Sequence, residues 1–303
     1  MAISREVEGE LTTYKAESYW QIVYRRLKKH KLAIISLVLL IIIILACIFG
    51  PFFVKYHYND MESFDPDNPL VGEYKPPSKL HPFGTDELGR DTLSRVLYGG
   101  RISLFVGFAS VFSAIIIGVF VGAISGYYGG ISDTLLMRFT DIMFSIPTLP
   151  LLVVLARVIP GGGIWKIILV ITIFGWMTDA RIVRGVYLSL KEQEFAEAAK
   201  AIGASNARII WRHLLPNSMA PIIVSSTLGV GGNIIYEAAL SYLGFGIMPP
   251  TPSWGNMLQN AQSAMFNAPW LIWFPGIAIF VTVLAFNFLG DGLRDALDPR
   301  LKL

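Results

Sequence analysis

Six long runs of apolar residues restrict what this chain can fold into. An α-helix needs roughly 20 apolar residues to cross a hydrocarbon core about 30 Å thick. The runs lie near residues 32–54, 102–125, 135–159, 164–180, 218–245 and 269–290. Hydrophobic residues make up 53% of the chain and charged residues only 16%, a balance typical of membrane proteins. The sequence therefore predicts an all-α membrane protein with six transmembrane helices.

Residues 1–31 precede the first span and end in a basic cluster. Trp20, Val23 and Leu27 interleave with that cluster and predict an amphipathic helix in the inner membrane interface, an elbow into the first span. Because lysine and arginine are retained on the cytoplasmic side, the N-terminus is predicted to be cytoplasmic. The cluster comprises Arg25, Arg26, Lys28, Lys29 and Lys31.

Six crossings from this start define the predicted organisation of the chain. Residues 32–54 form the first span and residues 55–101 lie outside the cytoplasm. Residues 102–290 form a core with the other five spans, and its polar segment 189–216 lies in the cytoplasm. The tail, residues 291–303, also ends inside.

The polar segment 189–216 begins with a helix-start signal. Ser189 and Glu192 have the spacing of a capping box and predict a helix from about Leu190. One face of this helix carries a narrow apolar stripe suited to docking in another protein's groove. The stripe consists of Phe195, Ala198, Ala199 and Ile202.

The second half of the segment predicts another short helix. Gly203 is suited to the left-handed conformation that ends a helix, and Ser205 is suited to cap the next one. Pro216 is expected to stop that second helix, since proline clashes with the preceding turn. The prediction is a compact pair of helices without catalytic residues.

This spacing resembles the EAA loop of the membrane subunits of bacterial ABC importers. The family pattern is Glu-Ala-Ala, three residues, Gly, nine residues, Ile, one residue, Leu-Pro, with histidine here at the Ile position. The resemblance implies a coupling-helix loop that inserts into a cleft on a cytoplasmic ATPase. The matching residues are Glu197, Ala198, Ala199, Gly203, His213, Leu215 and Pro216.

Three further strings narrow the resemblance to the C-type permease subunit of dipeptide and oligopeptide importers, in which histidine at the Ile position is common. Together with the EAA segment they cover the chain from about residue 20 onward. They begin at His81-Pro82-Phe83-Gly84-Thr85-Asp86, Leu240-Ser241-Tyr242-Leu243-Gly244-Phe245-Gly246 and Gly290-Asp291-Gly292-Leu293-Arg294-Asp295.

The resemblance implies a type I ABC importer permease fold in the plasma membrane of a bacterium or archaeon. Its implied partners are a second permease subunit, two ATPase subunits, an extracytoplasmic substrate-binding protein, a peptide substrate and the lipid bilayer, with no nucleic acid. ATP and Mg would bind to the ATPase subunits, so no cofactor is expected in this chain. The same branch includes subunits for nickel, glutathione and other small solutes, which are the alternative substrates.

Catalytic and nucleotide-binding motifs are missing from the sequence. The single cysteine, Cys47, lies inside the first span, and the four histidines are scattered. No His-Glu-x-x-His, Gly-x-Ser-x-Gly or phosphate-binding Gly-x-x-x-x-Gly-Lys-Ser/Thr string occurs. We therefore expect no enzymatic activity in this chain, and ATP hydrolysis in partner subunits.

Glu237 is the only formally charged residue between Arg212 and Asp291, and it lies in the fifth span. A carboxylate there costs on the order of 3 kcal/mol on insertion scales and normally faces a bundle interior or aqueous cavity. We expect it to line the pathway, either as a wall that tolerates peptide ammonium groups or as a gate contact to the companion permease. The alternative is a hydrogen-bonded residue without a transport role.

A function of a different class, an ion-coupled transporter or intramembrane enzyme, would use Glu237, Asp141 and Asp179. An enzyme needs converging groups, whereas these carboxylates are predicted at different depths. Ion-coupled carriers often contain inverted repeats, and the sequence shows none. Asp141 and Asp179 lie close in sequence to Arg138 and Arg181, and we interpret both pairs as anchors at the inner membrane surface.

Charges of both signs gather in the segment before the second span. They predict an ion-pair lattice that packs an outer segment onto the membrane face, the alternative being direct contact with the charged ends of a peptide. Exposed charge pairs are usually structural, which favours the lattice. Its expected members are Asp86, Arg90, Asp91, Arg95 and Arg101.

Overall fold

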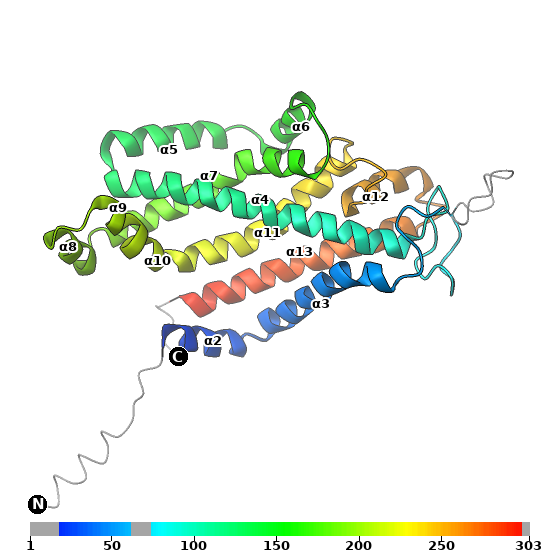
Figure 1. The fold of residues 1–303 in the computed structure, drawn as a ribbon, viewed down its shortest axis with the longest axis horizontal. Helices are drawn as coiled ribbons and strands as arrows, with labels where there is room; N and C mark the ends of the chain where they lie inside the picture. Colours follow the sequence, from blue (N-terminus) through cyan, green and yellow to red (C-terminus); the bar gives the residue numbers. More distant parts are fainter. Residues whose placement is uncertain (1–17, 62–73, 299–303) are drawn as a thin grey trace, which may run out of the picture.

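The structure, a computed structural model, describes residues 18–61 and 74–298, and its long helices run roughly along one axis (Figure 1). No β-strand forms among these residues, although Thr85 and Asp91 make an isolated bridge. The helices are α2 (Tyr19–Lys29), α3 (Lys31–Phe53), α4 (Thr92–Tyr128), α5 (Gly130–Phe144), α6 (Thr148–Val158), α7 (Ile164–Leu190), α8 (Glu194–Ala201), α9 (Asn206–Arg208), a π-helix (Ile209–Leu214), α10 (Leu215–Asn217), α11 (Met219–Tyr242), α12 (Trp254–Asn260), a 3-10 helix (Ala261–Ala264) and α13 (Trp270–Leu297).

Four helices are long and apolar enough to cross a membrane, namely α3, α4, α11 and α13. Helices α5 and α6 satisfy the same condition together but meet at a 90° bend, so the predicted span 135–159 is not one straight helix. The bend follows from Pro147, because the residue before a proline is pushed out of the helical conformation. Helix α7 is 27 residues long, but charged side chains, including Lys166 and Asp179, interrupt its apolar sequence. The count of six crossings stays a prediction.

Helix α4 begins ten residues before the predicted second span. Its 37 residues correspond to about 55 Å at 1.5 Å per residue, well beyond the hydrocarbon core. Asp91 caps it by accepting a hydrogen bond from the Ser94 N–H at 2.8 Å. Arg95 and Val96 in its first turns are buried, because these turns pack onto the loops at the end of the molecule opposite α8 instead of lying free in solvent.

A row of glycines lets α4 and α7 approach closely. Gly118, Gly122 and Gly126 recur every fourth residue and therefore share one face of α4. A Cβ atom at Gly118 would lie 2.7 Å from the Trp176 carbonyl oxygen, and one at Gly126 would lie 2.7 Å from the Tyr187 Cβ. Small residues at this spacing are typical of helix pairs in membranes.

Helices α11 and α13 complete the bundle. Helix α11 packs against α4, α7 and α13, while α3 lies against α13 and α4. At the end of the bundle opposite α8, called the outer end below, Trp254 of α12 is fully buried and donates its indole N–H to the Val96 carbonyl oxygen at 2.9 Å. Gly255 lets α12 lie directly on Ala238 of α11. The helices therefore converge on a well-packed outer end.

The predicted amphipathic elbow is confirmed as α2, which crosses beneath the end of α13 (Figure 1). Its Val23 is buried in a cluster with Ala296 and Leu297 of α13. Arg26 donates a hydrogen bond to the Asp298 carbonyl oxygen at 2.6 Å. The start of the described chain and the end of α13 thus lie at the same end of the molecule.

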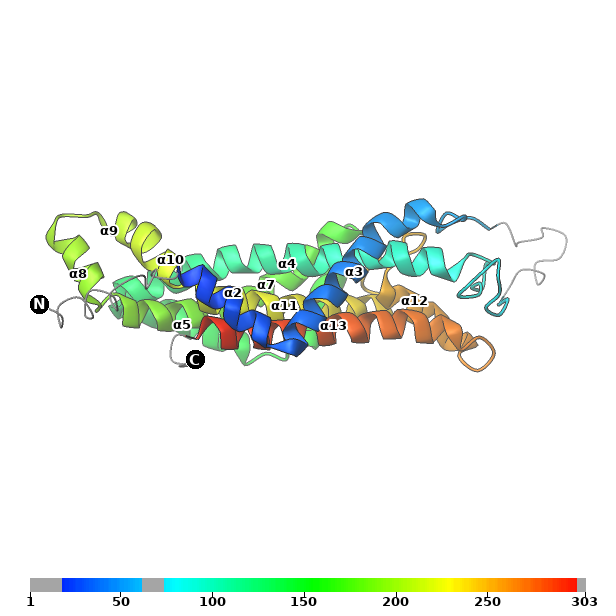
Figure 2. The ribbon, with the colours of Figure 1, turned by 90° about the horizontal axis from the view of Figure 1, so that it is seen from below.

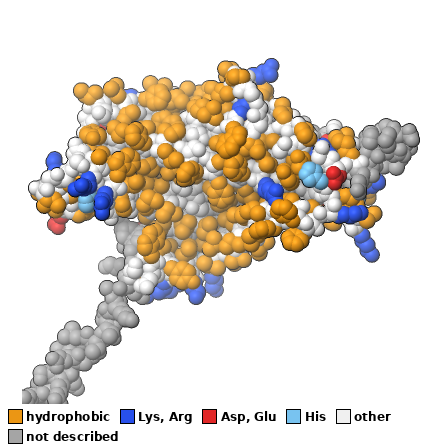
Figure 3. All heavy atoms as spheres, viewed as in Figure 1, with side chains coloured by type: hydrophobic (Ala, Val, Ile, Leu, Met, Phe, Trp, Pro, Cys, Tyr) orange, Lys and Arg blue, Asp and Glu red, His pale blue; other side chains and the backbone are white. Residues whose placement is uncertain are grey.

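Apolar side chains cover the middle of the molecule's surface, and most charges gather toward its ends (Figure 3). Exposed large hydrophobic residues include Ile42 on α3, Phe112 on α4 and Phe280 on α13. Such an apolar band is what a lipid-facing surface requires.

Candidate functional site

Helices α8 and α9 protrude from one end of the bundle (Figure 2). The predicted start of α8 is wrong: Leu190 is the last residue of α7, and α8 begins at Glu194 with Gln193 at the N-cap. Helix α7 continues this far because the Tyr187 side chain is fully buried and its hydroxyl donates to the Ile210 carbonyl oxygen at 3.1 Å. Ser189 therefore lies inside α7 and caps nothing.

The apolar stripe of α8 divides between two faces. Ala199 is buried, together with Ala196, in a cluster formed with the π-helix. Phe195 and Ile202 are 39% and 86% exposed, and Ala198 is exposed between them. These three residues, Phe195, Ala198 and Ile202, form an apolar surface at the tip, and we call them the tip surface.

The turn after α8 follows the prediction. Gly203 has φ +81°, the left-handed conformation that favours glycine. Ser205 accepts a hydrogen bond from the Arg208 N–H and caps α9.

The prediction that Pro216 stops the second helix is wrong. A π-helix precedes this proline, and the chain continues through α10 into α11. The wider π turn leaves room for the proline ring, which lacks an N–H to bond backward.

The structure brings the seven residues of the EAA pattern to this one end of the molecule, on two different faces. Glu197, Ala198, Gly203 and Pro216 are exposed, whereas Ala199 is buried and His213 and Leu215 are half-buried. The inward-facing residues hold α8 and the following turns together. The outward-facing ones are available to a partner.

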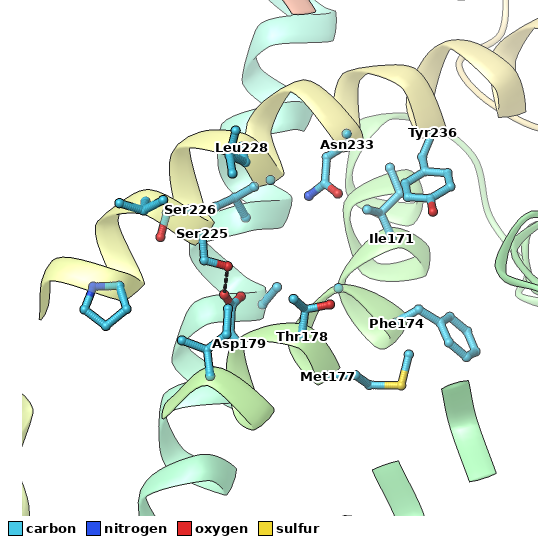
Figure 4. Close-up of a pocket in the computed structure, with 18 of the residues that line it drawn as sticks. Ile171, Phe174, Met177, Thr178, Asp179, Ser225, Ser226, Leu228, Asn233 and Tyr236 are labelled. Carbon is cyan, nitrogen blue, oxygen red and sulfur yellow. Dashed lines mark hydrogen bonds between the residues drawn. The ribbon is translucent and has the colours of Figure 1, made fainter. Parts of the chain in front are cut away.

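A cavity of about 730 Å³ lies between α7 and α11, with further walls from α4, α6 and the end of α13. Its lining is mostly apolar and includes Ile171, Phe174 and Met177 of α7 (Figure 4). Asp179 accepts a hydrogen bond from the Ser225 hydroxyl at 2.6 Å across the gap. The sequence analysis did not predict this cavity. Polar residues within the apolar runs of α7 and α11, such as Asp179 and Asn233, could have indicated it.

Glu237 does not reach this cavity. Its side chain is completely buried and accepts hydrogen bonds from the hydroxyls of Ser103 and Ser241, each at 2.7 Å. The Ser103 oxygen in turn accepts the Trp254 N–H at 3.2 Å, and the Ser241 oxygen accepts the Ile247 N–H at 3.0 Å. In this structure helices and loops close around Glu237, so it does not line the cavity, and its role in the pathway or gate stays a prediction. Glu237 joins α4, α11 and α12 at the outer end.

Replacing Glu237 with leucine is expected to lower thermal stability. The Ser103 and Ser241 hydroxyls would lose their buried acceptor, at a cost of about 1–3 kcal/mol for each group. Glu237→Gln keeps one carbonyl acceptor and should lose less. Thermal unfolding of the purified complex in detergent measures both variants. An unchanged melting temperature for Glu237→Leu, with uptake lost, would instead support a pathway role.

The predicted charge lattice forms in part, around the Asp86 carboxylate. Arg90 and Arg95 both contact the Asp86 carboxylate, at 2.8 and 3.3 Å. Burial raises the pKa of the adjacent Glu87, whose carboxylate also contacts Arg90. Arg101 lies outside this network, because it donates to carbonyl oxygens of α3 and holds that helix against α4.

Asp91 pairs with a histidine and not with the arginines of the lattice. Besides capping α4, its carboxylate lies 3.0 Å from His81 Nδ1. Both side chains are buried, so this part of the lattice packs the outer loop and is not a surface for peptide termini.

Two ion pairs fasten α5 to α7 near the protruding end. Asp133 pairs with Arg184, and Asp141 pairs with Arg181 instead of its sequence neighbour Arg138. Among the described residues, no three His, Cys, Asp or Glu side chains lie close enough to hold a metal ion.

Long apolar helices with a cavity between them and a polar pair of helices at one end are typical of a membrane transport protein. Residues 114–303 match the family described as binding-protein-dependent transport system inner membrane component. Residues 18–77 match the N-terminal transmembrane domain of oligopeptide transport permease C. The chain belongs to this family of multi-pass inner-membrane permeases.

Relatives of known name align with almost the whole chain. The oligopeptide transport system permease protein of Bacillus subtilis is 43% identical over 97% of this chain and 94% of its own length. The dipeptide transport system permease protein of Alkalihalophilus pseudofirmus is 44% identical over 95% and 92%. A glutathione transport system permease protein of Escherichia coli is 45% identical over 93% and 91%.

A solved structure shares the fold. The inward-facing MetNI methionine ABC transporter contains a chain that matches with a TM-score of 0.55 and 23% identity, over 67% of this chain and 96% of that one. This similarity confirms the predicted type I ABC importer permease fold.

Proposed function

We propose that this chain is one of two permease subunits of an ATP-driven importer for dipeptides or oligopeptides. The family match and the peptide-transport relatives support this assignment. The observation that carries it is the protruding tip surface, where Phe195, Ala198 and Ile202 lie exposed at the end of a helix rooted in the bundle. Two partner ATPase subunits bind ATP and Mg, and one of them docks on this surface.

The packing beneath α8 couples the docking surface to the ends of α4, α7 and α11. Ala196 and Ala199 of α8 share one buried cluster with Val119 of α4, Tyr187 of α7 and Ile222 of α11. At the same end, Lys191 donates to the Gly126 carbonyl oxygen at 3.1 Å. A displacement of α8 therefore moves the ends of α4, α7 and α11 together, and these three helices contribute walls of the cavity. ATP-driven motion of the docked subunits thereby changes access to the cavity.

The arrangement of the ends supports the proposed orientation. Helix α8, the basic helix α2 and the end of α13 lie at one end, which is the cytoplasmic side by the positive-inside rule. The buried charge lattice, α12 and the preceding loop lie at the other end, where an extracytoplasmic binding protein delivers substrate. Both termini are then cytoplasmic.

The similarity to a glutathione permease supports glutathione, a small peptide-like molecule, as an alternative substrate. An intramembrane enzyme or ion-coupled carrier has less support, because its three candidate carboxylates have separate partners. Glu237 binds serine hydroxyls, Asp141 binds Arg181, and Asp179 binds Ser225.

Purification of the tagged chain in mild detergent, followed by identification of bound proteins, tests the assembly. We expect a second permease and ATPase subunits to co-purify in a fixed ratio, and the binding protein to join when peptide is present. A chain that purifies only with copies of itself would contradict the proposal.

A further inference from the structure

Asp179 is a carboxylate in the wall of the cavity, where Arg294 at the end of α13 is the cationic lining residue. Its side chain accepts a hydrogen bond from the Ser225 hydroxyl, and no Lys, Arg or His among the described residues forms an ion pair with it. The two arginines that follow it on α7 form ion pairs with other carboxylates: Arg181 pairs with Asp141, and Arg184 pairs with Asp133. A buried carboxylate is costly unless it is paired. The cavity thus offers an unused acceptor for a cation.

Packing holds this acceptor in place from two sides. On α4, a Cβ atom at Gly118 would lie 2.6 Å from the Asp179 Cβ, so the glycine makes room for the aspartate. On α11, Ser225 holds one carboxylate oxygen at 2.6 Å. Figure 4 shows the carboxylate pointing across the gap toward α11. Its position does not depend on a mobile loop.

Apart from Arg294 and Asp298 at the end of α13, the rest of the cavity lining is apolar or neutral. Phe174 and Met177 of α7 and Leu228 of α11 line it, while Asn233 and Tyr236 provide neutral polar groups further along α11 (Figure 4). The volume of about 730 Å³ lies in the range of pockets that hold small molecules. Asp179, held between α7 and α11, is therefore placed to bind one positive group on the occupant, while Arg294 and Asp298 line the cavity at the end of α13.

We propose that Asp179 binds the ammonium group of the substrate as it passes through this cavity. An ammonium group donates three hydrogen bonds, and a carboxylate acceptor makes them charge-assisted. The amino terminus of a peptide and a lysine side chain supply the same chemistry. This inference rests on the proposed import of peptides and assigns a specificity-determining residue to it.

The test uses the complete complex in proteoliposomes, with each peptide at a concentration that saturates the binding protein. The three peptides are trialanine, its N-acetyl form, and an N-acetyl tripeptide with one lysine. Asp179→Asn keeps the side-chain volume and an acceptor for Ser225 but removes the charge. We expect uptake per ATP hydrolysed to fall about tenfold both for trialanine and for the lysine peptide. Uptake of N-acetyltrialanine should stay unchanged.

Asp141→Asn is the matched control, because it removes a carboxylate that pairs with Arg181 outside the cavity. It should leave the ratio between the peptides as in the wild type. An equal loss for all three peptides with Asp179→Asn, or hydrolysis without uptake for all three, would assign Asp179 to packing or to the companion permease and overturn the proposal. No change for any peptide would also overturn it.

If the wild-type complex moves none of the peptides, the proposed substrate class fails, and a binding measurement still decides the role of Asp179. The probe is 2-phenylethylamine, which has an apolar body and one ammonium group, titrated into the purified complex by calorimetry. We expect binding that weakens at least about tenfold in Asp179→Asn. Equal affinity in both proteins would overturn the inference.

Discussion

Replacing Gly122 with leucine is expected to prevent α4 and α7 from packing and to remove most of the folded protein from the membrane. A Cβ atom at this position would overlap the Ala180 carbonyl oxygen, which is backbone and cannot rotate away. Even Gly122→Ala should destabilise the fold by about 1–3 kcal/mol. Size-exclusion chromatography and thermal unfolding of the detergent-solubilised complex measure both effects.

Gly185 provides the matched control for this prediction. It lies on α7, is exposed, and a Cβ atom added to it would have no neighbouring atom within 4 Å. Gly185→Ala should be neutral or stabilising by up to about 1 kcal/mol, since alanine favours helices. Equal melting temperatures for Gly122→Ala and Gly185→Ala would show that the glycine row does not determine the helix contact.

Sequence reasoning predicted the parts of the fold that depend on composition and local signals. The apolar runs located α3, α11 and α13, and the alternating basic and aromatic residues located α2. It missed features that depend on tertiary contacts. Helix α4 extends ten residues further because its polar first turns are buried under the outer loops, which no periodicity reveals.

Replacing Ile202 with aspartate is expected to abolish ATP-driven uptake while leaving the permease folded. The side chain is 86% exposed, so a charge there breaks no internal contact. In the assembled importer the same charge would be buried, unpaired, in an apolar contact with an ATPase subunit, which costs several kcal/mol. Uptake and ATP hydrolysis measured side by side in proteoliposomes report the loss.

Ile131→Asp is the control, because Ile131 is 80% exposed on α5 and lies outside the tip surface. It should assemble with the ATPase subunits and transport at near wild-type rates. Normal coupled uptake by Ile202→Asp, with the ATPase subunits bound, would show that the tip surface is not the docking element.

In the candidate site, too, the sequence predicted the features that depend on local signals and missed those that depend on tertiary contacts. The EAA spacing identified the protruding segment and the left-handed turn at Gly203, since both are local. It did not show that Ala199 faces inward, because that depends on the π-helix packed beneath α8. A lone charge in an apolar run indicates polar surroundings but does not identify them, and the sequence did not show that the hydroxyls of Ser103 and Ser241 surround Glu237.

Uptake of labelled peptide into proteoliposomes tests most directly whether this chain is one half of an ATP-driven importer. Vesicles that contain this chain, its companion permease and the ATPase subunits, with ATP enclosed on the ATPase side and binding protein on the other, should accumulate the peptide. Vesicles that contain this chain alone, or the assembly without ATP, should accumulate none. ATP-driven accumulation by the isolated chain would contradict the account.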